Sequence, residues 1–340
     1  MRVLVTGAAG FIGYHLADRL AADGHELICL DSFSDYYDVS LKHARASKLR
    51  VDRGIEVVQL DLADGGAAQK FFASSKPEIV YHLAAQPGVR YSMEAPQSYI
   101  DSNLLGFSNI LEACRQCKPR NLLFASSSSV YGANTAHPSD ENAVTDHPLS
   151  LYAATKKANE ALAHSYAHLY GLPSTGLRFF TVYGEWGRPD MAFFKFANAM
   201  RAGEPLTVHN HGKMRRDFTY VGDIVESLVR LADKPPSANA QWQSSSPDSS
   251  SSGVAPYRVF NIGNGQPEEL MRYIQVLANA FGVDPDLEMI DIQPGEVEVT
   301  WADTRDLEAV TGFKPSTSIE EGIGRFAKWY SEFYGPGQRS

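Results

Sequence analysis

The sequence predicts an α/β fold in which a doubly wound parallel sheet is followed by a smaller C-terminal α/β region. In the first half of the chain, short apolar runs alternate with amphipathic stretches, as at 12–23 and 102–117. Such runs are typical of strands buried on both faces of a parallel sheet, and amphipathic helices provide the crossovers between them. A glycine-rich turn directly follows the first run. The runs lie at 3–6, 26–30, 55–60, 79–83 and 121–126.

The second half of the chain is less regular. We place the boundary at residue 178, so the first region spans 1–178 and the second spans 179–335, with some segments of the second returning to the sheet. Residues 235–256 are rich in serine and proline, which bury little apolar surface, so we expect a flexible loop exposed to solvent. Periodicity predicts helices near 151–170, 191–202, 221–233, 267–281 and 318–333, with strands at 174–179 and within 259–265.

Composition limits the partners and the compartment. The 340 residues carry a formal net charge of −9, which disfavours nonspecific binding to nucleic acid or to anionic membranes. No apolar run is long enough to span a bilayer, and no signal-peptide pattern is present, so we expect a cytoplasmic protein. Cys114 and Cys117 form a CxxC without a second ligand pair, and their apolar neighbours recur at helical spacing. We therefore expect a helix there rather than a metal or redox site.

A dinucleotide site is predicted at the glycine-rich turn. Gly7, Gly10 and Gly13 lie between the first strand and the first helix. Glycine permits the tight turn, lets the backbone approach a pyrophosphate and packs the helix against the strand, while the helix N-terminus offers N–H groups to the phosphates. The GxxGxxG spacing departs from the commoner GxGxxG, so the motif needs support from the other strand ends.

That support comes from the ends of the following strands. The second run ends at Asp31, whose carboxylate can accept hydrogen bonds from an adenosine ribose and would repel a 2′-phosphate, so NAD is favoured over NADP. Ligands of doubly wound sheets bind at the carboxyl ends of the strands, where small and polar residues recur in this chain. The residues expected to bind the cofactor are Gly7, Gly10, Phe11, Ile12, Gly13, Asp31, Ser32, Asp61, Leu62, Leu83, Ala84, Ala85, Gln86, Ser126, Tyr152, Lys156 and Phe179.

Two segments carry the residues expected to be catalytic. Ser127, Ser128 and Ser129 follow the fifth strand, and Tyr152 and Lys156 are four residues apart on one face of a helix. Tyrosine is a poor base at its unperturbed pKa of about 10. A neighbouring ammonium, together with the positive charge of an oxidised nicotinamide, favours the phenolate and lowers that pKa.

These motifs resemble those of the extended short-chain dehydrogenase/reductases, and in particular of nucleotide-sugar epimerases and dehydratases. The resemblance covers nearly the whole chain except the serine-rich tract. It implies a Rossmann-type NAD-binding domain, a smaller C-terminal domain that binds a nucleotide sugar, and a homodimer formed through a four-helix bundle. Tyr152 and Lys156 match the family's catalytic pair, and Ser127 matches its assisting Ser or Thr.

The resemblance also implies the reaction. In the family, the tyrosine takes the proton of the sugar 4-hydroxyl while hydride passes from C4 to NAD⁺. Similar dehydratases then carry an Asp-Glu pair just before the VYG of the catalytic loop, and UDP-glucuronate decarboxylases carry a Glu there. This chain has Ser128 and Ser129 in that position. We therefore expect the keto sugar to rotate and to receive the hydride on its other face, which is a 4-epimerisation.

The second half suggests the substrate. Residues 178–192, 84–92 and 292–303 resemble matching segments of UDP-glucuronate 4-epimerases, although Glu296 and Pro87 depart from the residues that many relatives carry. Serines and the backbone near Gly88 could bind a carboxylate through neutral donors. Arginines suit a pyrophosphate because they donate two hydrogen bonds at once. The residues expected to bind the substrate are Gly88, Val89, Arg90, Thr181, Arg188, Met191, Arg216, Gln293 and Glu296.

Three alternatives remain open from the sequence. The chain could be a UDP-glucose or UDP-galactose 4-epimerase, although the latter carry Asn where this chain has Thr181. It could be a UDP-glucuronate decarboxylase. It could also be a non-catalytic NAD-sensing regulator, although such proteins usually lose the YxxxK motif that this chain keeps.

Overall fold

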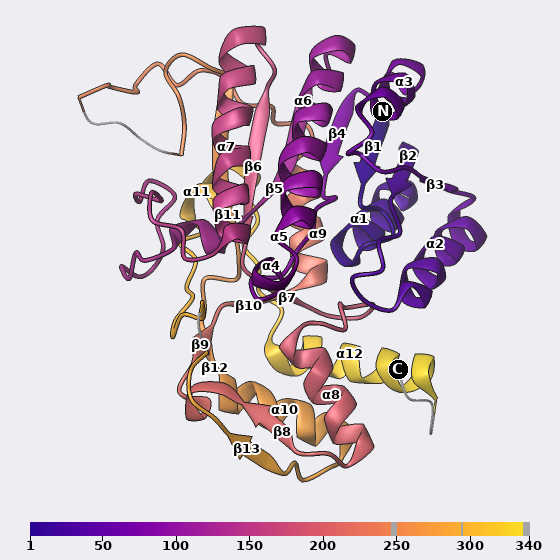
Figure 1. Cartoon of the computed structure of the whole chain (residues 1–340), viewed down its shortest axis with the longest axis vertical. Coiled ribbons are helices and arrows are strands. Elements are labelled where there is room, and N and C mark those ends of the chain that lie inside the picture. The colour runs from indigo at the N-terminus through magenta and orange to yellow at the C-terminus, as the bar shows by residue number, and fades with distance from the viewer. Residues whose placement is uncertain (246–249, 294, 336–340) are drawn as a thin grey trace.

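The computed structural model describes residues 1–245, 250–293 and 295–335. Its centre is a seven-stranded sheet with the order β11-β6-β5-β4-β1-β2-β3, in which every neighbouring pair is parallel. Helices cover both faces of this sheet (Figure 1). The fold class predicted from the sequence is therefore confirmed. The strands are β1 (Arg2–Thr6), β2 (Glu26–Asp31), β3 (Val57–Gln59), β4 (Ile79–His82), β5 (Asn121–Ser127), β6 (Ser174–Phe179) and β11 (Tyr257–Ile262).

Alternate residues of a strand point to opposite faces, and each face has its own core. Val3 and Val5 of β1 pack in the cluster that includes α1 (Phe11–Ala22) and α9 (Val221–Leu231), whereas Leu4 packs in the cluster on the other face. All three side chains are fully buried, as a sheet covered on both faces requires. The helices of the second face are α3 (Gly65–Ser75), α6 (Gly106–Cys117) and α7 (Leu151–Tyr170).

A smaller layer lies below the sheet in the view of Figure 1. It contains α8 (Ala192–Ala202), α10 (Leu270–Phe281), α12 (Ile319–Tyr334) and a parallel pair of short strands, β8 (Leu206–Val208) and β13 (Leu287–Met289). Two more short pairs connect this layer to the sheet, one parallel and one antiparallel: β7 (Thr181–Tyr183) with β10 (Phe218–Tyr220), and β9 (Arg215–Arg216) with β12 (Glu268–Glu269).

The remaining elements are short or lie at the edges of the sheet. They are α2 (Val39–Arg53), α4 (Tyr91–Glu94), α5 (Pro96–Tyr99), α11 (Arg305–Thr311), a π-helical turn (Ile100–Leu105), and 3₁₀ turns at Ser128–Tyr131 and His209–Gly212. The helix expected at 102–117 thus begins with a π-helical turn and becomes α-helical at Gly106. In the part of the chain that the structure describes, no helix combines the length and the apolar character needed to cross a bilayer.

The serine-rich stretch differs from the expectation of an exposed loop. Ser250, Ser252 and Ala255 are buried, because this part of the stretch packs on α7. The ring of His164 hydrogen-bonds the Ser252 hydroxyl at 2.9 Å, and the ring of His168 hydrogen-bonds the Val254 carbonyl at the same distance. The prediction of exposure is therefore wrong at Ser250, Ser252 and Ala255, whereas Val254 and most of 235–245 are exposed as expected. Residues 246–249 of the same stretch lie outside the described residues.

Candidate active site

The glycine-rich turn has no room for side chains. Gly7 has φ +71°, a left-handed conformation that favours glycine, and a Cβ there would lie 2.8 Å from the Ala84 backbone nitrogen. A Cβ on Gly13 would lie 2.1 Å from the Gly7 carbonyl oxygen. The helix α1 starts after Gly10, which has no side chain to cap it, so its first N–H groups face outward as donors for an anionic ligand.

Asp31 is the last residue of β2, and its side chain also stabilises the glycine-rich turn. One carboxylate oxygen accepts from the Ala9 N–H at 3.0 Å and the other accepts from the Phe33 N–H at 2.8 Å. The side chain is buried, so both bonds fix its orientation. Each oxygen retains lone-pair capacity for a ribose hydroxyl. The geometry therefore fits an NAD ribose and gives Asp31 a second task that the sequence did not reveal.

The other residues expected to contact the cofactor lie along the same edge of the sheet. Ser126 differs from the rest, because its buried hydroxyl donates to Glu160 at 2.6 Å, so its side chain is engaged beneath the site. Phe11 and Ile12 begin α1, Ser32 follows β2, Asp61 and Leu62 follow β3, Leu83, Ala84, Ala85 and Gln86 follow β4, and Phe179 ends β6.

The predicted catalytic pair lies in the first two turns of α7. Ser150 caps this helix by accepting from the Ala153 N–H at 3.1 Å, which places Tyr152 and Lys156 one turn apart at its N-terminal end. The Lys156 ammonium donates to the Ala125 carbonyl of β5 at 2.9 Å. Because Lys156 is buried, its pKa falls to about 7. The pair therefore faces the carboxyl end of β5.

The positive charge that acts on the Tyr152 phenol in the structure is that of Arg188. Burial raises the pKa of the Tyr152 phenol, and the hydrogen bond with Ser127 and the positive charge of Arg188 oppose this increase. We expected the Lys156 ammonium to lower it. That expectation includes the charge of a bound nicotinamide and stays a prediction; in the structure the Lys156 ammonium donates to the Ala125 carbonyl. The Ser127 hydroxyl therefore lies close enough to the Tyr152 phenol to act on its pKa.

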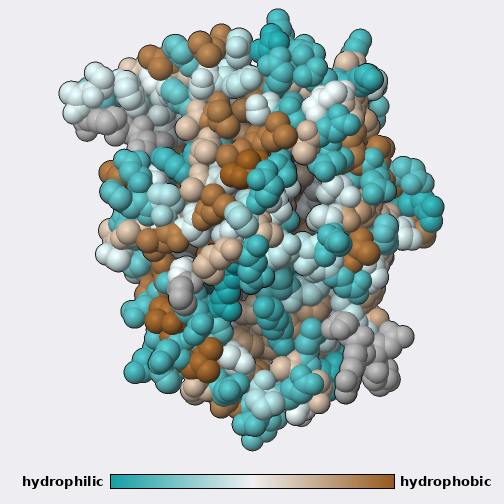
Figure 2. All heavy atoms as spheres, viewed as in Figure 1, coloured by the Kyte–Doolittle hydropathy of each residue, from teal (hydrophilic) through white to brown (hydrophobic). Residues whose placement is uncertain are grey.

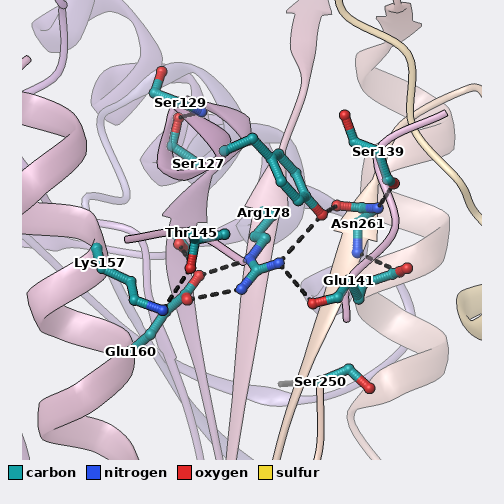
Figure 3. A network of polar contacts seen from close by, with 12 residues as sticks. Ser127, Ser129, Ser139, Glu141, Thr145, Lys157, Glu160, Arg178, Ser250 and Asn261 are labelled. Atoms are coloured by element: carbon teal, nitrogen blue, oxygen red, sulfur yellow. Dashed lines mark hydrogen bonds and ion pairs between the residues drawn. The ribbon is translucent and has the colours of Figure 1, made fainter. Parts of the chain in front are cut away.

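The serine cluster forms a tight turn over a buried ionic network (Figure 3). The Ser127 hydroxyl accepts from the Ser129 N–H at 3.1 Å, and Ser128 starts the 3₁₀ turn. Beneath it, the guanidinium of Arg178 binds both carboxylate oxygens of Glu160 at 2.9 Å. The Arg178 guanidinium also donates to the Glu141 carbonyl and to the Tyr131 hydroxyl. These contacts connect the catalytic helix to β6 directly under the serines.

The substrate side begins after β7 with an arginine that is already paired. Arg188 forms two hydrogen bonds with Asp190, at 2.9 and 2.5 Å. Tyr36 donates to the same carboxylate at 3.2 Å. This pairing was not foreseen, because we expected Arg188 to be directed to a pyrophosphate. The positive charge of Arg188 acts on Tyr152, which places the two residues in one electrostatic environment.

A second cluster joins the region after β4 to the smaller layer. Arg90 donates to Glu296 at 2.5 Å, and His209 lies 3.0 Å from the same carboxylate. Glu296 also accepts from the Gln293 N–H at 3.1 Å. Gly88, two residues before Arg90, has φ +99°, and its carbonyl accepts from the Tyr99 hydroxyl. Arg90, Gln293 and Glu296 are thus brought together as predicted contacts of one site.

Arg216 has neutral partners, unlike Arg188 and Arg90. It donates to the carbonyl oxygens of Arg215 and Glu298, at 3.1 and 2.9 Å, and burial lowers its pKa. Asp217, its neighbour, is fully buried and accepts backbone N–H groups of Asn264, Gly265 and Ala302. The Thr181 N–H donates to the Asp217 carbonyl at 3.2 Å, and Met191 precedes α8.

Sequence reasoning missed the residues that hold these groups in place. Asp190 pairs with Arg188 and His209 with Arg90, Tyr36 donates to Asp190, and Glu160 supports the serine turn. Glu160 lies four residues after Lys156 on the buried face of α7, and a carboxylate on such a face is a signal that a buried cation must accompany it.

The parallel sheet, the glycine turn, the acidic end of β2 and the Tyr/Lys helix together define an enzyme of the Rossmann class whose site fits NAD. Comparisons with known proteins agree. Residues 3–263 match the model of the NAD dependent epimerase/dehydratase family. The chain therefore belongs to this family, and the predictions of the family, of NAD as cofactor and of an epimerase are confirmed.

Individual relatives extend over the whole chain. Protein CapI of Staphylococcus aureus is 52% identical over 335 residues, covering 98% of this chain and 99% of that protein. A probable UDP-glucuronate 4-epimerase of Rhizobium meliloti is 48% identical over 334 residues, with 98% of each covered. The crystal structure of a UDP-glucuronic acid 4-epimerase from Bacillus cereus, in complex with UDP-glucuronic acid and NAD, superposes with a TM-score of 0.86 at 30% identity, covering 98% of this chain and 100% of that one.

Proposed function

We propose that this chain is a UDP-glucuronate 4-epimerase, which interconverts UDP-glucuronate and UDP-galacturonate through a transient 4-keto sugar. The observation that carries the proposal is the turn after β5, near Tyr152, in which Ser128 and Ser129 present hydroxyls rather than carboxylates. The Rhizobium meliloti relative and the Bacillus cereus structure, both named for this activity, support the substrate.

Residues of this chain would accept and return the proton of the sugar 4-hydroxyl. Tyr152 would take the proton of the sugar 4-hydroxyl, and Ser127, close to the phenol, would orient it toward that hydroxyl. The site would hold NAD, which would supply hydride acceptance from C4 and hydride return to the opposite face of the ring. Lys156, which donates to the Ala125 carbonyl, would hold the nicotinamide ribose.

The surroundings of Tyr152 disfavour elimination of water. The carboxylate that acts electrostatically on Tyr152 is Asp190. Burial alone would raise the pKa of Asp190, but Arg188 outweighs burial and holds that pKa low, so Asp190 is ionised and has no proton to donate. A group that must expel water from the sugar needs such a proton. The keto sugar is thus left to rotate and to be reduced again.

Neutral donors suit a substrate that has to rotate. We propose that Ser128, Ser129 and the backbone near Gly88 receive the glucuronate carboxylate, while Arg216 binds the UDP pyrophosphate. Arg216 is half-buried, and its present partners are carbonyl oxygens, so a phosphate oxygen would be a better acceptor than those it has.

The competing functions differ in their products. A UDP-glucose or UDP-galactose 4-epimerase would share the Tyr152 chemistry but would not need to bind a carboxylate. A decarboxylase would release CO₂ from the same keto sugar. A non-catalytic NAD sensor would bind the cofactor and turn nothing over.

The test is to incubate the purified protein, without added reductant, with UDP-glucuronate and separately with UDP-glucose, and to identify products by chromatography and NMR. We expect UDP-galacturonate from the first and little product from the second. UDP-xylose would show a decarboxylase, UDP-galactose as the main product would show a neutral-sugar epimerase, and no product from either would favour the sensor.

We also propose a homodimer formed through α6 and α7, and a cytoplasmic location. Hydrophobic side chains gather on the face that these helices present in Figure 2. Leu169 and Tyr170 of α7 are 63% and 51% exposed, Leu105 just before α6 is 48% exposed, and a partner on this face would cover all three. Light scattering would test the dimer, since a monomeric mass at micromolar concentration would exclude it. The three free cysteines suit a reducing compartment.

A further inference from the structure

Arg45 is a fully buried arginine whose partners are all neutral. It lies on α2, far from the Tyr152 helix, and its side chain is 0% exposed. A guanidinium has five N–H donors, and all five are used. They bind the Ala9 carbonyl at 2.9 Å, the Tyr37 hydroxyl at 2.9 Å, the Gly187 carbonyl at 3.0 Å, and the Trp186 carbonyl twice, at 3.1 and 2.7 Å.

These acceptors come from two segments of the site. Ala9 lies inside the glycine-rich turn, between Gly7 and Gly10, and its own N–H donates to Asp31. The carbonyls of Trp186 and Gly187 directly precede Arg188, in a segment 141 residues away from Arg45 in the sequence. One side chain therefore bridges the cofactor turn and the substrate-side segment.

The bridge fixes a backbone conformation that would not form readily by itself. Trp186 has φ +56°, a left-handed conformation that is uncommon for a bulky residue. Its carbonyl is the one that accepts two bonds from Arg45. Gly187 is closely confined too, since a Cβ there would lie 2.6 Å from the Phe193 ring.

Burying a cation costs solvation free energy, and here five hydrogen bonds to neutral acceptors offset it. An apolar side chain of the same volume would leave those acceptors without a donor. Arginine differs from lysine in presenting its donors in a rigid plane, which can hold several carbonyls in a fixed relative position.

The loop before α2 extends the same connection. Tyr37 accepts from Arg45, and its neighbour Tyr36 donates to Asp190, the partner of Arg188. The Tyr36 hydroxyl also lies against Gly88, since a Cβ on Gly88 would be 2.5 Å from it. Movement of the glycine turn would therefore be transmitted to Arg188 and to the Gly88 backbone.

We propose that Arg45 is a positioning residue that couples occupation of the NAD site to the placement of the Trp186–Asp190 segment, and hence to nucleotide binding. The proposal rests on the proposed function, because it takes NAD at the glycine turn and UDP at the arginine side. With NAD bound, the Ala9 carbonyl is held in place, and Arg45 then holds the segment that carries Arg188.

The test measures how UDP changes the affinity of the holoenzyme for NAD. UDP lacks the sugar, so it reports on the coupling without contact with the nicotinamide. Holoenzyme is dialysed to equilibrium against a series of NAD concentrations with and without saturating UDP, and the ratio of the two Kd values is the coupling. We expect UDP to tighten NAD binding about tenfold in the unaltered protein and to have almost no effect in Arg45→Met.

Arg50→Met is the matched control, because Arg50 lies on the exposed side of the same helix; its ratio should equal that of the unaltered protein. A merely structural Arg45 would weaken NAD binding with and without UDP alike and leave the ratio near ten, which would overturn the proposal. If Arg45→Met fails to fold, Arg45→Lys, which offers only three donors, should lower the ratio severalfold, and an unchanged ratio would again overturn it.

The unaltered protein separates the two proposals. A ratio of one in that protein overturns the coupling even if it epimerises UDP-glucuronate. A tenfold ratio that falls in Arg45→Met supports the coupling, even if the product test shows that a different UDP-sugar is turned over.

Discussion

The ammonium of Lys156 donates to the carbonyl oxygen of Ala125 across 2.9 Å, so the catalytic helix is attached to the end of β5 through the residue that precedes the serines. Ser126, the next residue, donates to Glu160 one turn further along the same helix. Two successive residues of the strand are therefore bonded to two successive turns of the helix. This register fixes the distance between Tyr152 and Ser127 before any substrate arrives.

Tyr152→Phe should bind NAD and fold normally but lose turnover by roughly 10²- to 10⁴-fold, because the group that takes the hydroxyl proton is removed. Initial rates with UDP-glucuronate, together with the NAD content of the purified variant, measure this. Tyr170→Phe, at the exposed end of the same helix, is the control and should keep full activity. An active Tyr152→Phe would exclude Tyr152 as the base.

The pH dependence of stability should report on Lys156. Burial lowers its folded pKa from 10.5 to about 7, so between pH 7 and pH 10 the unfolded chain binds more protons than the folded chain at this site. The contribution of Lys156 to the free energy of unfolding therefore rises with pH from pH 7 to pH 10. Below pH 7 the full cost of burying the charged lysine is present. Urea unfolding of Lys156→Met should show a weaker increase than the unaltered protein and than Lys157→Met. Equal slopes in all three would contradict the prediction.

Asp31→Asn should weaken NAD binding, because an amide replaces a carboxylate that holds the Ala9 N–H and faces the ribose. Loss of a hydrogen bond to a charged group costs about 1.5–3 kcal/mol, or about 10- to 150-fold in affinity. Calorimetric titration with NAD checks this, with Asp35→Asn on the following exposed loop as control. If the two variants bind NAD equally well, Asp31 does not contact the cofactor.

Glu160→Gln should destabilise the fold by about 3–5 kcal/mol, because Arg178 is left buried without a charged partner. Glu160→Leu combined with Arg178→Met removes both charges and should recover much of that loss. Chemical denaturation measures both, and Glu112→Gln in the exposed pair with Arg115 should change little. If the double variant is as unstable as Glu160→Gln, the hydrogen bonds of the network, and not only the pairing of its two charges, contribute to the free energy of unfolding.

Arg216→Ala should weaken UDP binding by roughly 10- to 100-fold with little change in thermal stability, since charge-assisted bonds to phosphate are among the stronger ones. Arg215→Ala, its exposed neighbour on β9, is the control. Calorimetry with UDP distinguishes them. Equal affinities would remove Arg216 from the nucleotide site.

The sequence predicts those parts of the fold that depend on local residue patterns. The apolar runs of β1 to β5 and the glycine turn follow from periodicity and from backbone conformation, and Tyr152 and Lys156 share a face because of helical spacing. The roles of Arg45 and Asp190 could not be predicted in this way, because each depends on a partner whose position is set by packing. Arg45 meets Trp186 across 141 residues. Burial of Ser252 likewise depends on a histidine of α7 that no local pattern connects with it.

The strand β11 completes the sheet by pairing with β6, although some 80 residues of chain separate them. During synthesis, β6 therefore leaves the ribosome as an edge strand, with its backbone donors and acceptors unpaired on one side until residue 262 has emerged. A fragment that stops at residue 178 would keep that edge open permanently and would be prone to strand-to-strand aggregation. The segment between the two strands, which includes α8, β8 and α9, thus has to be made before the nucleotide-binding half is protected.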